Sequence, residues 1–248
     1  MRFNGEDELI IVKSDIFQKY TTKPNLKNFT LVHLVLTHSK RDGYTFNMST
    51  NKIGFFGGTF DPPHIGHLIL AGEAVLQFNL NRLLWVLTPE PPHKQENSIT
   101  PLHHRFAMLQ AMIAHHSNFE ISRLEIDRPG PHYTIDTLKI LKEQETDSEI
   151  ILLIGGDSLA DLPTWRFASD LIPAVSKIGV MRRPSDFTDL DALEAQLAGI
   201  KNKIQFIDAL LQPVSSSELR RRIKSGEMAR YYLAPEVYDY IEKNNLYR

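Results

Sequence analysis

The sequence has 248 residues, 42% of them hydrophobic and 23% charged, with a formal net charge of −2 at pH 7. This composition is typical of a globular chain with a sizeable core, and the near-neutral charge argues against a general polyanion-binding surface, so nucleic acid is not an expected partner. The absence of cysteine excludes disulfides and thiolate metal sites, and no apolar run approaches the roughly 18 residues that span a membrane, so we expect a cytoplasmic protein.

The first 50 residues are predicted to lie outside the main fold. Only residues 31–38 resemble a strand, and polar sequence surrounds them. Met48 stands shortly before the first clear strand, where an α/β domain can begin. Two interpretations therefore stay open for residues 1–50: an N-terminal extension of unknown role, or a misassigned translation start.

From residue 51 to 248, short apolar runs alternate with segments of helical period. We predict strands at residues 52–56, 82–88, 119–125, 149–154, 177–181 and 204–208. Between the first two strands, an amphipathic helix is predicted by the spacing of Ile65, Leu68, Ile69, Gly72 and Leu76. The alternation predicts an α/β, Rossmann-like fold: a doubly wound, mostly parallel sheet with helices on both faces. Ligands of such sheets bind beyond the carboxyl ends of the strands.

One of those ends carries "GGTFDPPHIGHL" at residues 57–68. Gly57 and Gly58 are expected to turn the backbone with positive φ and to let a ligand approach the main chain. Thr59 adds a hydroxyl, and the two prolines that follow direct the chain into the next helix.

Two histidines, His64 and His67, are predicted in the first turn of that helix. The free N–H groups at a helix N-terminus already favour an anion, and imidazoles add donors suited to phosphate oxygens in a transition state. The alternatives are surface or capping histidines and metal ligands. His-x-x-His without cysteine or a clear third ligand is a weak zinc signal, so no protein-bound metal is expected.

The "HIGH" at residues 64–67 resembles the signature of a nucleotidyltransferase superfamily, which class I aminoacyl-tRNA synthetases share. The longer string resembles the nicotinate-nucleotide adenylyltransferases. Further segments resemble that family in the same order: "PPHK" at 91–94, "HYTIDTL" at 132–138, "IGGDSLADLPTW" at 154–165 and "VSSSELRRRI" at 214–223. The resemblance covers residues 51–248.

The resemblance implies that the phosphate of nicotinate mononucleotide attacks the α-phosphorus of ATP, giving deamido-NAD and pyrophosphate. ATP and nicotinate mononucleotide are then the partners, and Mg²⁺ enters with ATP. Both reactants are polyanions, so catalysis depends on alignment and charge stabilisation. The catalytic residues implied are His64, His67, Lys94 and Arg220. An isolated lysine is usually solvated, and only the match to "PPHK" gives Lys94 a role.

ATP contacts are implied at a second helix start, where Ser215 and Glu218 form a capping-box pattern. In the family motif, hydroxyls and the arginine grip the β- and γ-phosphates. Val214 and Ser217 replace the family's isoleucine and threonine. The implied ATP-binding residues are Gly57, Gly58, Thr59, Phe60, Asp157, Ser215, Ser216 and Ser217. Asp157 is placed to accept from ribose hydroxyls, and a helix N-cap is its alternative role.

Contacts to nicotinate mononucleotide are implied at Thr134, Trp165, Arg166 and Arg183. Trp165 lies in a Pro-Thr-Trp turn, where it can stack on a pyridine ring or pack into the core. Trp85 lies inside a predicted strand and is expected in the core.

Other functions remain open. A transferase acting on phosphopantetheine or making a CDP-alcohol would share residues 57–68, but should lack "PPHK" and the 154–165 segment. A synthetase-like enzyme would need a tRNA-binding region. A nucleotide sensor on the same fold would be expected to lack a phosphate-gripping residue. Oligomer formation is also open.

Overall fold

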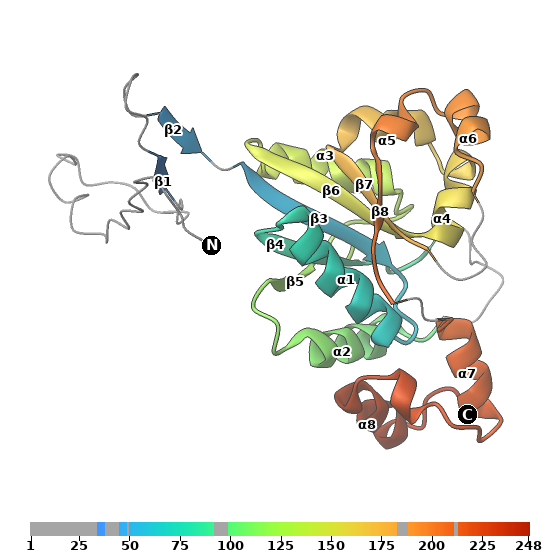
Figure 1. The fold of residues 1–248 in the computed structure, drawn as a ribbon. Helices are drawn as coiled ribbons and strands as arrows, with labels where there is room; N and C mark the ends of the chain where they lie inside the picture. The colour runs from blue at the N-terminus through green and yellow to red at the C-terminus, as the bar shows by residue number, and fades with distance from the viewer. Residues whose placement is uncertain (1–33, 38–44, 49, 92–98, 183–187, 211–212) are drawn as a thin grey trace, which may run out of the picture. The chain divides into compact units, whose positions relative to one another are not determined.

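The computed structural model describes residues 34–37, 45–48, 50–91, 99–182, 188–210 and 213–248 (Figure 1). The chain divides into two units, Met1–Thr50 and Asn51–Arg248. In the first unit, β1 (Leu34–Thr37) pairs antiparallel with β2 (Thr45–Met48). The strand expected at residues 31–38 is therefore present at Leu34–Thr37. The sequence did not suggest its partner, β2.

The second unit is built on a six-stranded sheet in which every neighbouring pair is parallel. The strands are β3 (Asn51–Gly58), β4 (Arg82–Leu87), β5 (Phe119–Ser122), β6 (Ser148–Gly155), β7 (Lys177–Met181) and β8 (Ile204–Ile207). Their order across the sheet is β5-β4-β3-β6-β7-β8. The chain thus runs outward from β3 to one edge and then returns to β6 to build the other half. This doubly wound order confirms the predicted fold class, and it creates a switch point between β3 and β6.

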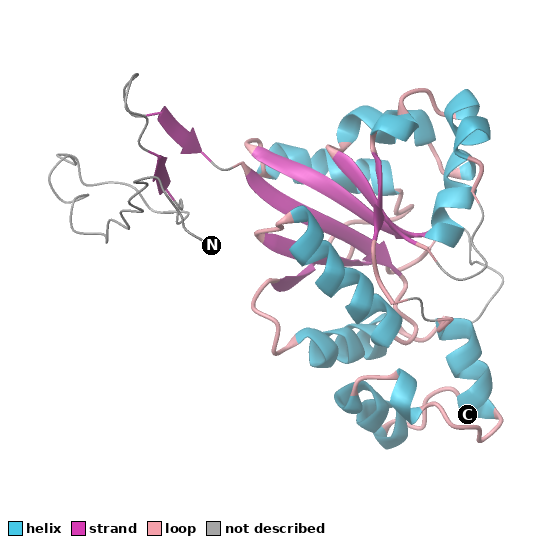
Figure 2. Cartoon of the chain, viewed as in Figure 1, coloured by secondary structure: helices cyan, strands magenta, loops and turns pink. Residues whose placement is uncertain are grey.

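Helices cover both faces of this sheet (Figure 2). One face carries α1 (Ile65–Phe78), α2 (Leu102–Ile113), α7 (Ser216–Lys224) and α8 (Pro235–Lys243). The other carries α3 (Thr134–Gln144), α4 (Gly156–Asp161), α5 (Ala168–Ala174) and α6 (Leu190–Gln196). Short 3-10 turns η2 (Leu162–Thr164), η3 (Ile200–Asn202) and η4 (Arg230–Tyr232) complete the connections.

The strands supply both cores because successive side chains point to opposite faces. Along β4, for example, Leu83 and Trp85 pack under α1 and α2, whereas Leu84 packs under α3. Trp85 is fully buried between Phe56 and Phe119, as its place in a strand predicted. The central strands β3, β4, β6 and β7 are buried on both faces and read as continuous apolar runs, which is why the sequence located them.

The buried face of α1 differs from the predicted one. Leu76, assigned to the buried stripe, is 74% exposed, and the residues buried are Gly66, Leu70, Ala71, Ala74 and Phe78. Apolar residues occupy more than one face of this helix, so its periodicity does not choose between them. The small side chains let the helix approach the sheet closely, and a Cβ at Gly179 on β7 would lie 2.9 Å from the Phe78 ring. Close packing of α1 against the sheet therefore determines which face of the helix is buried.

Within the described residues, no helix combines the length and the apolar character needed to cross a membrane.

Candidate active site

The turn after β3 ends at the switch point of the sheet. β3 ends at Gly58, its neighbour β6 ends at Gly155, and α1 and α4 begin just beyond. Most of the predicted phosphate-binding residues follow these two strands or belong to α7. The region beyond the carboxyl ends of β3 and β6 is therefore the candidate site.

The glycines of this turn do not act as predicted. Neither Gly57 nor Gly58 has positive φ; the left-handed residue is Phe60, with φ of 48°. Gly58 instead makes room for Phe60, because a Cβ there would lie 3.0 Å from its ring. The Phe60 ring is buried against Phe56 and Trp85, so any ligand contact of Phe60 would involve its backbone.

The helix begins where the sequence predicted, and its two histidines contact each other through a hydrogen bond and ring stacking. His64 is the N-cap of α1, and its backbone N–H donates to Nδ1 of His67 over 3.1 Å. The rings stack with centroids 3.7 Å apart, and His64 is only 3% exposed. A Cβ at Gly66 would lie 3.1 Å from the His64 ring, which explains the glycine between them. In the neutral His67 ring, Nδ1 accepts, so the proton is on Nε2, where it can be donated to a ligand.

The structure joins α7 to this turn. Arg220 NH1 donates to the Asp61 carbonyl at 2.6 Å, and Ser216 Oγ donates to the Pro62 carbonyl at 2.9 Å. Ser215 is the N-cap of α7, and its hydroxyl accepts from the Glu218 backbone N–H at 3.3 Å. Residues more than 150 positions apart thus meet at the turn that precedes the "HIGH" motif. Ser215 and Ser217 hydroxyls are 3.2 Å apart beside them.

The predicted capping box at α7 is only half formed. The Glu218 side chain pairs with Arg221 and Arg222 instead of reaching back to the N-cap. These two guanidinium groups lower the pKa of Glu218 to about 2. Arg221 and Arg222 belong to a surface ion-pair network, so of the three consecutive arginines only Arg220 bonds to the turn after β3.

Asp157 lies in the first turn of α4, directly beyond β6, and the N-cap of α4 is Gly155. The alternative N-cap role for Asp157 is therefore wrong. Its Oδ1 accepts from the Ser158 backbone N–H at 2.9 Å, and a Cβ at Gly155 would lie 2.6 Å from that oxygen. Gly155 is thus required for the observed position of the Asp157 carboxylate.

The predicted nicotinate-side residues follow the carboxyl ends of β5 and β6. Thr134 is the first residue of α3, and Trp165 is the C-cap of η2. Trp165 is partly exposed and packs with one part against the core beneath α3, as Tyr133 does, and its stacking on a pyridine ring stays a prediction. Arg166 is exposed, with its guanidinium 4.2 Å from the centre of the Phe167 ring. Lys94 and Arg183 lie outside the described residues.

The sequence did not point to Arg105, which hydrogen-bonds to the backbone of several segments around the candidate site. It is 1% exposed, and it donates to the carbonyls of Thr59, Thr88, Pro89 and Thr100 over 2.7–3.0 Å. Burial lowers its pKa, and nearby Asp61 acts in the opposite direction. The signal was present: Arg105 begins the buried stripe of α2, which continues through Met108, Leu109, Met112 and Ile113.

A second missed cluster joins the segment before Thr134 to Thr137 in the first turn of α3. The Thr137 hydroxyl donates to Glu125 Oε1 at 2.7 Å and accepts from Arg128 NH2 at 2.9 Å. Glu125 and His132 are buried beside it, and burial lowers the pKa of His132. This cluster anchors the segment that leads into α3.

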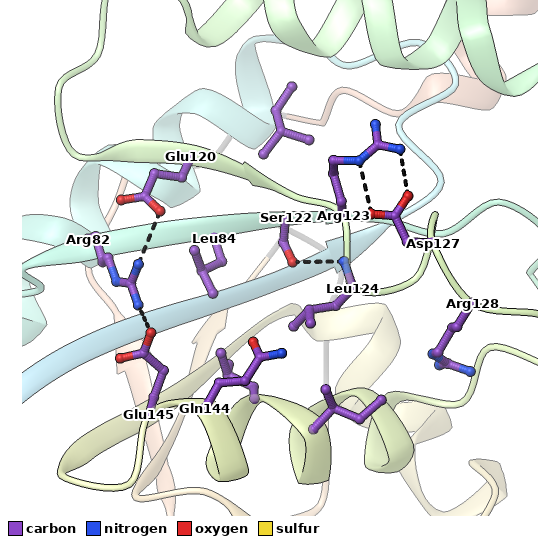
Figure 3. Close-up of a pocket in the computed structure, with 13 residues that line it drawn as sticks. Arg82, Leu84, Glu120, Ser122, Arg123, Leu124, Asp127, Arg128, Gln144 and Glu145 are labelled. Atoms are coloured by element: carbon purple, nitrogen blue, oxygen red, sulfur yellow. Dashed lines mark hydrogen bonds and ion pairs between the residues drawn. The ribbon is translucent and has the colours of Figure 1, made fainter. Parts of the chain in front are cut away.

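A pocket of about 500 Å³ elsewhere in the chain lies between β5 and α3 and contains none of the predicted site residues (Figure 3). Arg82, the first residue of β4, bonds there to Glu120 and Glu145, and Arg123 bonds to Asp127. The lining runs from Arg82, at the amino end of β4, to Arg128, beyond the carboxyl end of β5, and includes no residue of the turn after β3 or of α7, so we do not assign this pocket to the candidate site.

Comparison with known proteins agrees with this geometry. Residues 55–222 match the cytidylyltransferase-like family model. A probable nicotinate-nucleotide adenylyltransferase of Thermomicrobium roseum is 38% identical over 80% of this chain and 92% of its own length. A probable nicotinate-nucleotide adenylyltransferase of Bacillus licheniformis is 37% identical over 79% of this chain and 98% of its own length. The fold resembles the Plasmodium falciparum nicotinic acid mononucleotide adenylyltransferase complexed with NaAD, with a TM-score of 0.65 and 23% identity over 79% of this chain and 97% of that one. The chain therefore belongs to the cytidylyltransferase-like family and, within it, to the nicotinate-nucleotide adenylyltransferases.

Proposed function

We propose that this protein transfers the adenylyl group of ATP to nicotinate mononucleotide, giving deamido-NAD and pyrophosphate in NAD biosynthesis. The observation that carries the proposal is the junction of the "HIGH" turn with α7 at the switch point, through Arg220 and Ser216. This junction brings two helix N-termini, two imidazoles and a guanidinium to one turn, and such groups favour the phosphates of ATP. The relatives at 37–38% identity bear the corresponding name.

The reaction is an in-line displacement at phosphorus. A phosphate oxygen of nicotinate mononucleotide attacks the α-phosphorus of ATP, and the bond to the bridging oxygen of pyrophosphate breaks. We assign His67, through its Nε2–H, to the charge that develops on the α-phosphate oxygens, with stacked His64 fixing its ring. Arg220 and the hydroxyls of Ser215, Ser216 and Ser217 are assigned to the β- and γ-phosphates, together with Lys94.

The remaining roles concern the two nucleosides. Gly57, Gly58, Thr59 and the backbone of Phe60 are proposed to border the nucleotide, and the Asp157 carboxylate to accept from its ribose hydroxyls. Trp165 is proposed to stack on the pyridine ring, with Thr134, Arg166 and Arg183 near its carboxylate.

Mg²⁺ is proposed to arrive with ATP, held by phosphate oxygens and water, where it neutralises negative charge on the phosphates. In the described part of the chain, no group of three or more His, Asp or Glu side chains is arranged to hold a metal ion. The side chains that α7 brings to the turn after β3, the Arg220 guanidinium and the Ser216 hydroxyl, are hydrogen-bond donors, which suits phosphate oxygens rather than a cation. A cytoplasmic location remains a prediction.

The test is pyrophosphate release with ATP and MgCl₂, with nicotinate mononucleotide, nicotinamide mononucleotide or phosphopantetheine as acceptor. We expect the highest kcat/KM with nicotinate mononucleotide and no release above background with phosphopantetheine. A preference for phosphopantetheine would contradict the proposed substrate. ATP binding without release for any acceptor would favour a nucleotide sensor.

A further inference from the structure

The chain returns to the candidate site at its C-terminal end. After α8, Asn245 and Tyr247 both adopt left-handed backbone conformations, with φ of 48° and 66°. Asparagine tolerates this region, but for a bulky residue such as tyrosine it is a strained outlier that persists only when tertiary contacts hold it. The contact in this case is a hydrogen bond: the Tyr247 hydroxyl donates to Oδ1 of Asp61 at 2.6 Å.

Asp61 connects this tail to two other parts of the site. It is 4% exposed, and its second carboxylate oxygen, Oδ2, accepts from the Thr100 backbone N–H at 3.2 Å. Its main-chain carbonyl accepts from Arg220. One residue thus joins the C-terminal tail, the segment before α2, and α7.

The position of Asp61 is transmitted directly to the histidines. Only Pro62 and Pro63 separate it from His64, and both have a restricted backbone φ. A shift of the Asp61 backbone therefore moves the N-cap of α1 and the acceptor of Arg220 together. Both belong to the part of the site that we assign to the phosphates of ATP.

The chemistry of the pair suits a fixed contact. Burial raises the pKa of Tyr247, and the neighbouring Asp61 carboxylate raises it further, so the phenol stays protonated and remains a donor. The buried guanidinium of Arg105 interacts favourably with the charge of Asp61.

We propose that Tyr247 is a positioning residue for adenylyl transfer, which acts through Asp61 to place His64, His67 and Arg220. We assign it no contact with either substrate, and the inference rests on the proposed function. If Tyr247 acts in this way, its loss changes turnover and the KM for ATP and leaves the KM for nicotinate mononucleotide unchanged.

The experiment compares Tyr247→Phe with Tyr240→Phe in the full chain. Tyr240, in α8, shares a hydrogen bond of 3.0 Å with Nδ1 of His104 in α2, so its phenylalanine variant loses a similar hydroxyl contact away from Asp61. We expect Tyr247→Phe to lower kcat at least about fivefold and to raise KM for ATP, with KM for nicotinate mononucleotide within about twofold of wild type. Tyr240→Phe should keep all three values near wild type.

This pattern separates positioning from a structural role. Partial unfolding would lower the apparent kcat in proportion to the folded fraction, measured by circular dichroism at the assay temperature, and would leave both KM values unchanged. Such proportional loss, normal kinetics in Tyr247→Phe, or an equal effect in Tyr240→Phe would overturn the inference.

If Tyr247→Phe does not fold, Asp61→Asn provides the second test. An amide offers one acceptor oxygen where the carboxylate offers two, so the same loss of kcat and rise in KM for ATP are expected. Normal kinetics in Asp61→Asn would overturn the inference. The two failures are distinguishable. An inactive wild-type protein would contradict the proposed function, whereas the inference on Tyr247 is judged only from variants compared with an active wild type.

Discussion

His64 and His67 stack with ring centroids 3.7 Å apart and planes 21° from parallel, while the backbone N–H of the first donates to Nδ1 of the second. This arrangement separates two functions of one side chain. Nδ1 of His67 caps the helix, and we assign Nε2 to the contact with phosphate. The separation can be tested by substitutions that remove one function at a time.

The first prediction concerns His67. His67→Ala should lower kcat at least about a hundredfold, the scale of a lost transition-state donor. His67→Asn supplies an acceptor close to Nδ1 but no donor at the position of Nε2, so it should keep the helix cap and remain inactive. His67→Gln, whose amide reaches further, should recover part of the activity. His115→Ala, at an exposed histidine, is the control. Wild-type turnover in a folded His67→Asn protein would exclude the donor role.

The second prediction concerns Arg105. Arg105→Met retains much of the apolar volume but leaves four carbonyls of partly buried residues without their donor, so the free energy of unfolding should fall by about 3 kcal/mol or more. Urea denaturation measures this change. Arg123→Met removes an exposed ion pair with Asp127 and should cost less than about 1 kcal/mol. Equal losses in the two variants would show that the buried bonds of Arg105 have no special weight.

The third prediction separates the two tryptophans. Trp165→Leu should raise KM for nicotinate mononucleotide about tenfold and leave KM for ATP unchanged, because a stacking surface is lost on one side of the site. Trp85 is fully buried, so Trp85→Phe should lower the free energy of unfolding with both KM values near wild type. Steady-state kinetics with each substrate varied in turn distinguishes them. An unchanged KM for nicotinate mononucleotide in Trp165→Leu would assign that residue to packing alone.

The fourth prediction is a pH dependence of stability from His132. Burial lowers the pKa of His132; Glu125 and Glu90 oppose this shift, and Arg128 adds to it. The unfolded chain therefore binds a proton near the ordinary histidine pKa of about 6.5, where the folded protein does not. The contribution of His132 is fully present above that pH and is lost as the pH falls toward the lowered value. Urea denaturation of wild type and His132→Gln between pH 8 and 5 should show a shallower decline in the variant. Parallel curves would contradict the prediction.

Much of the candidate site was readable because its residues are neighbours in sequence. The string from Gly57 to His67 contains a strand end, a proline-directed turn and a helix start, and each has a local signal. Local signals failed where conformation depended on space. Positive φ was assigned to Gly57 and Gly58, yet these glycines accommodate an aromatic ring and the left-handed residue is Phe60. Likewise, periodicity alone could not choose the buried face of α1.

The sequence by itself determined the strands, the helix starts and the types of residue that meet a phosphate, because short apolar runs and capping residues act over a few positions. Only the tertiary structure decided which strands are neighbours, that Arg105 binds four carbonyls, and that Tyr247 reaches Asp61 across 186 positions. Hydrogen bonds between distant segments leave no periodic trace in the chain. They form only when packing brings a buried donor and acceptor together, since leaving either without a partner is costly.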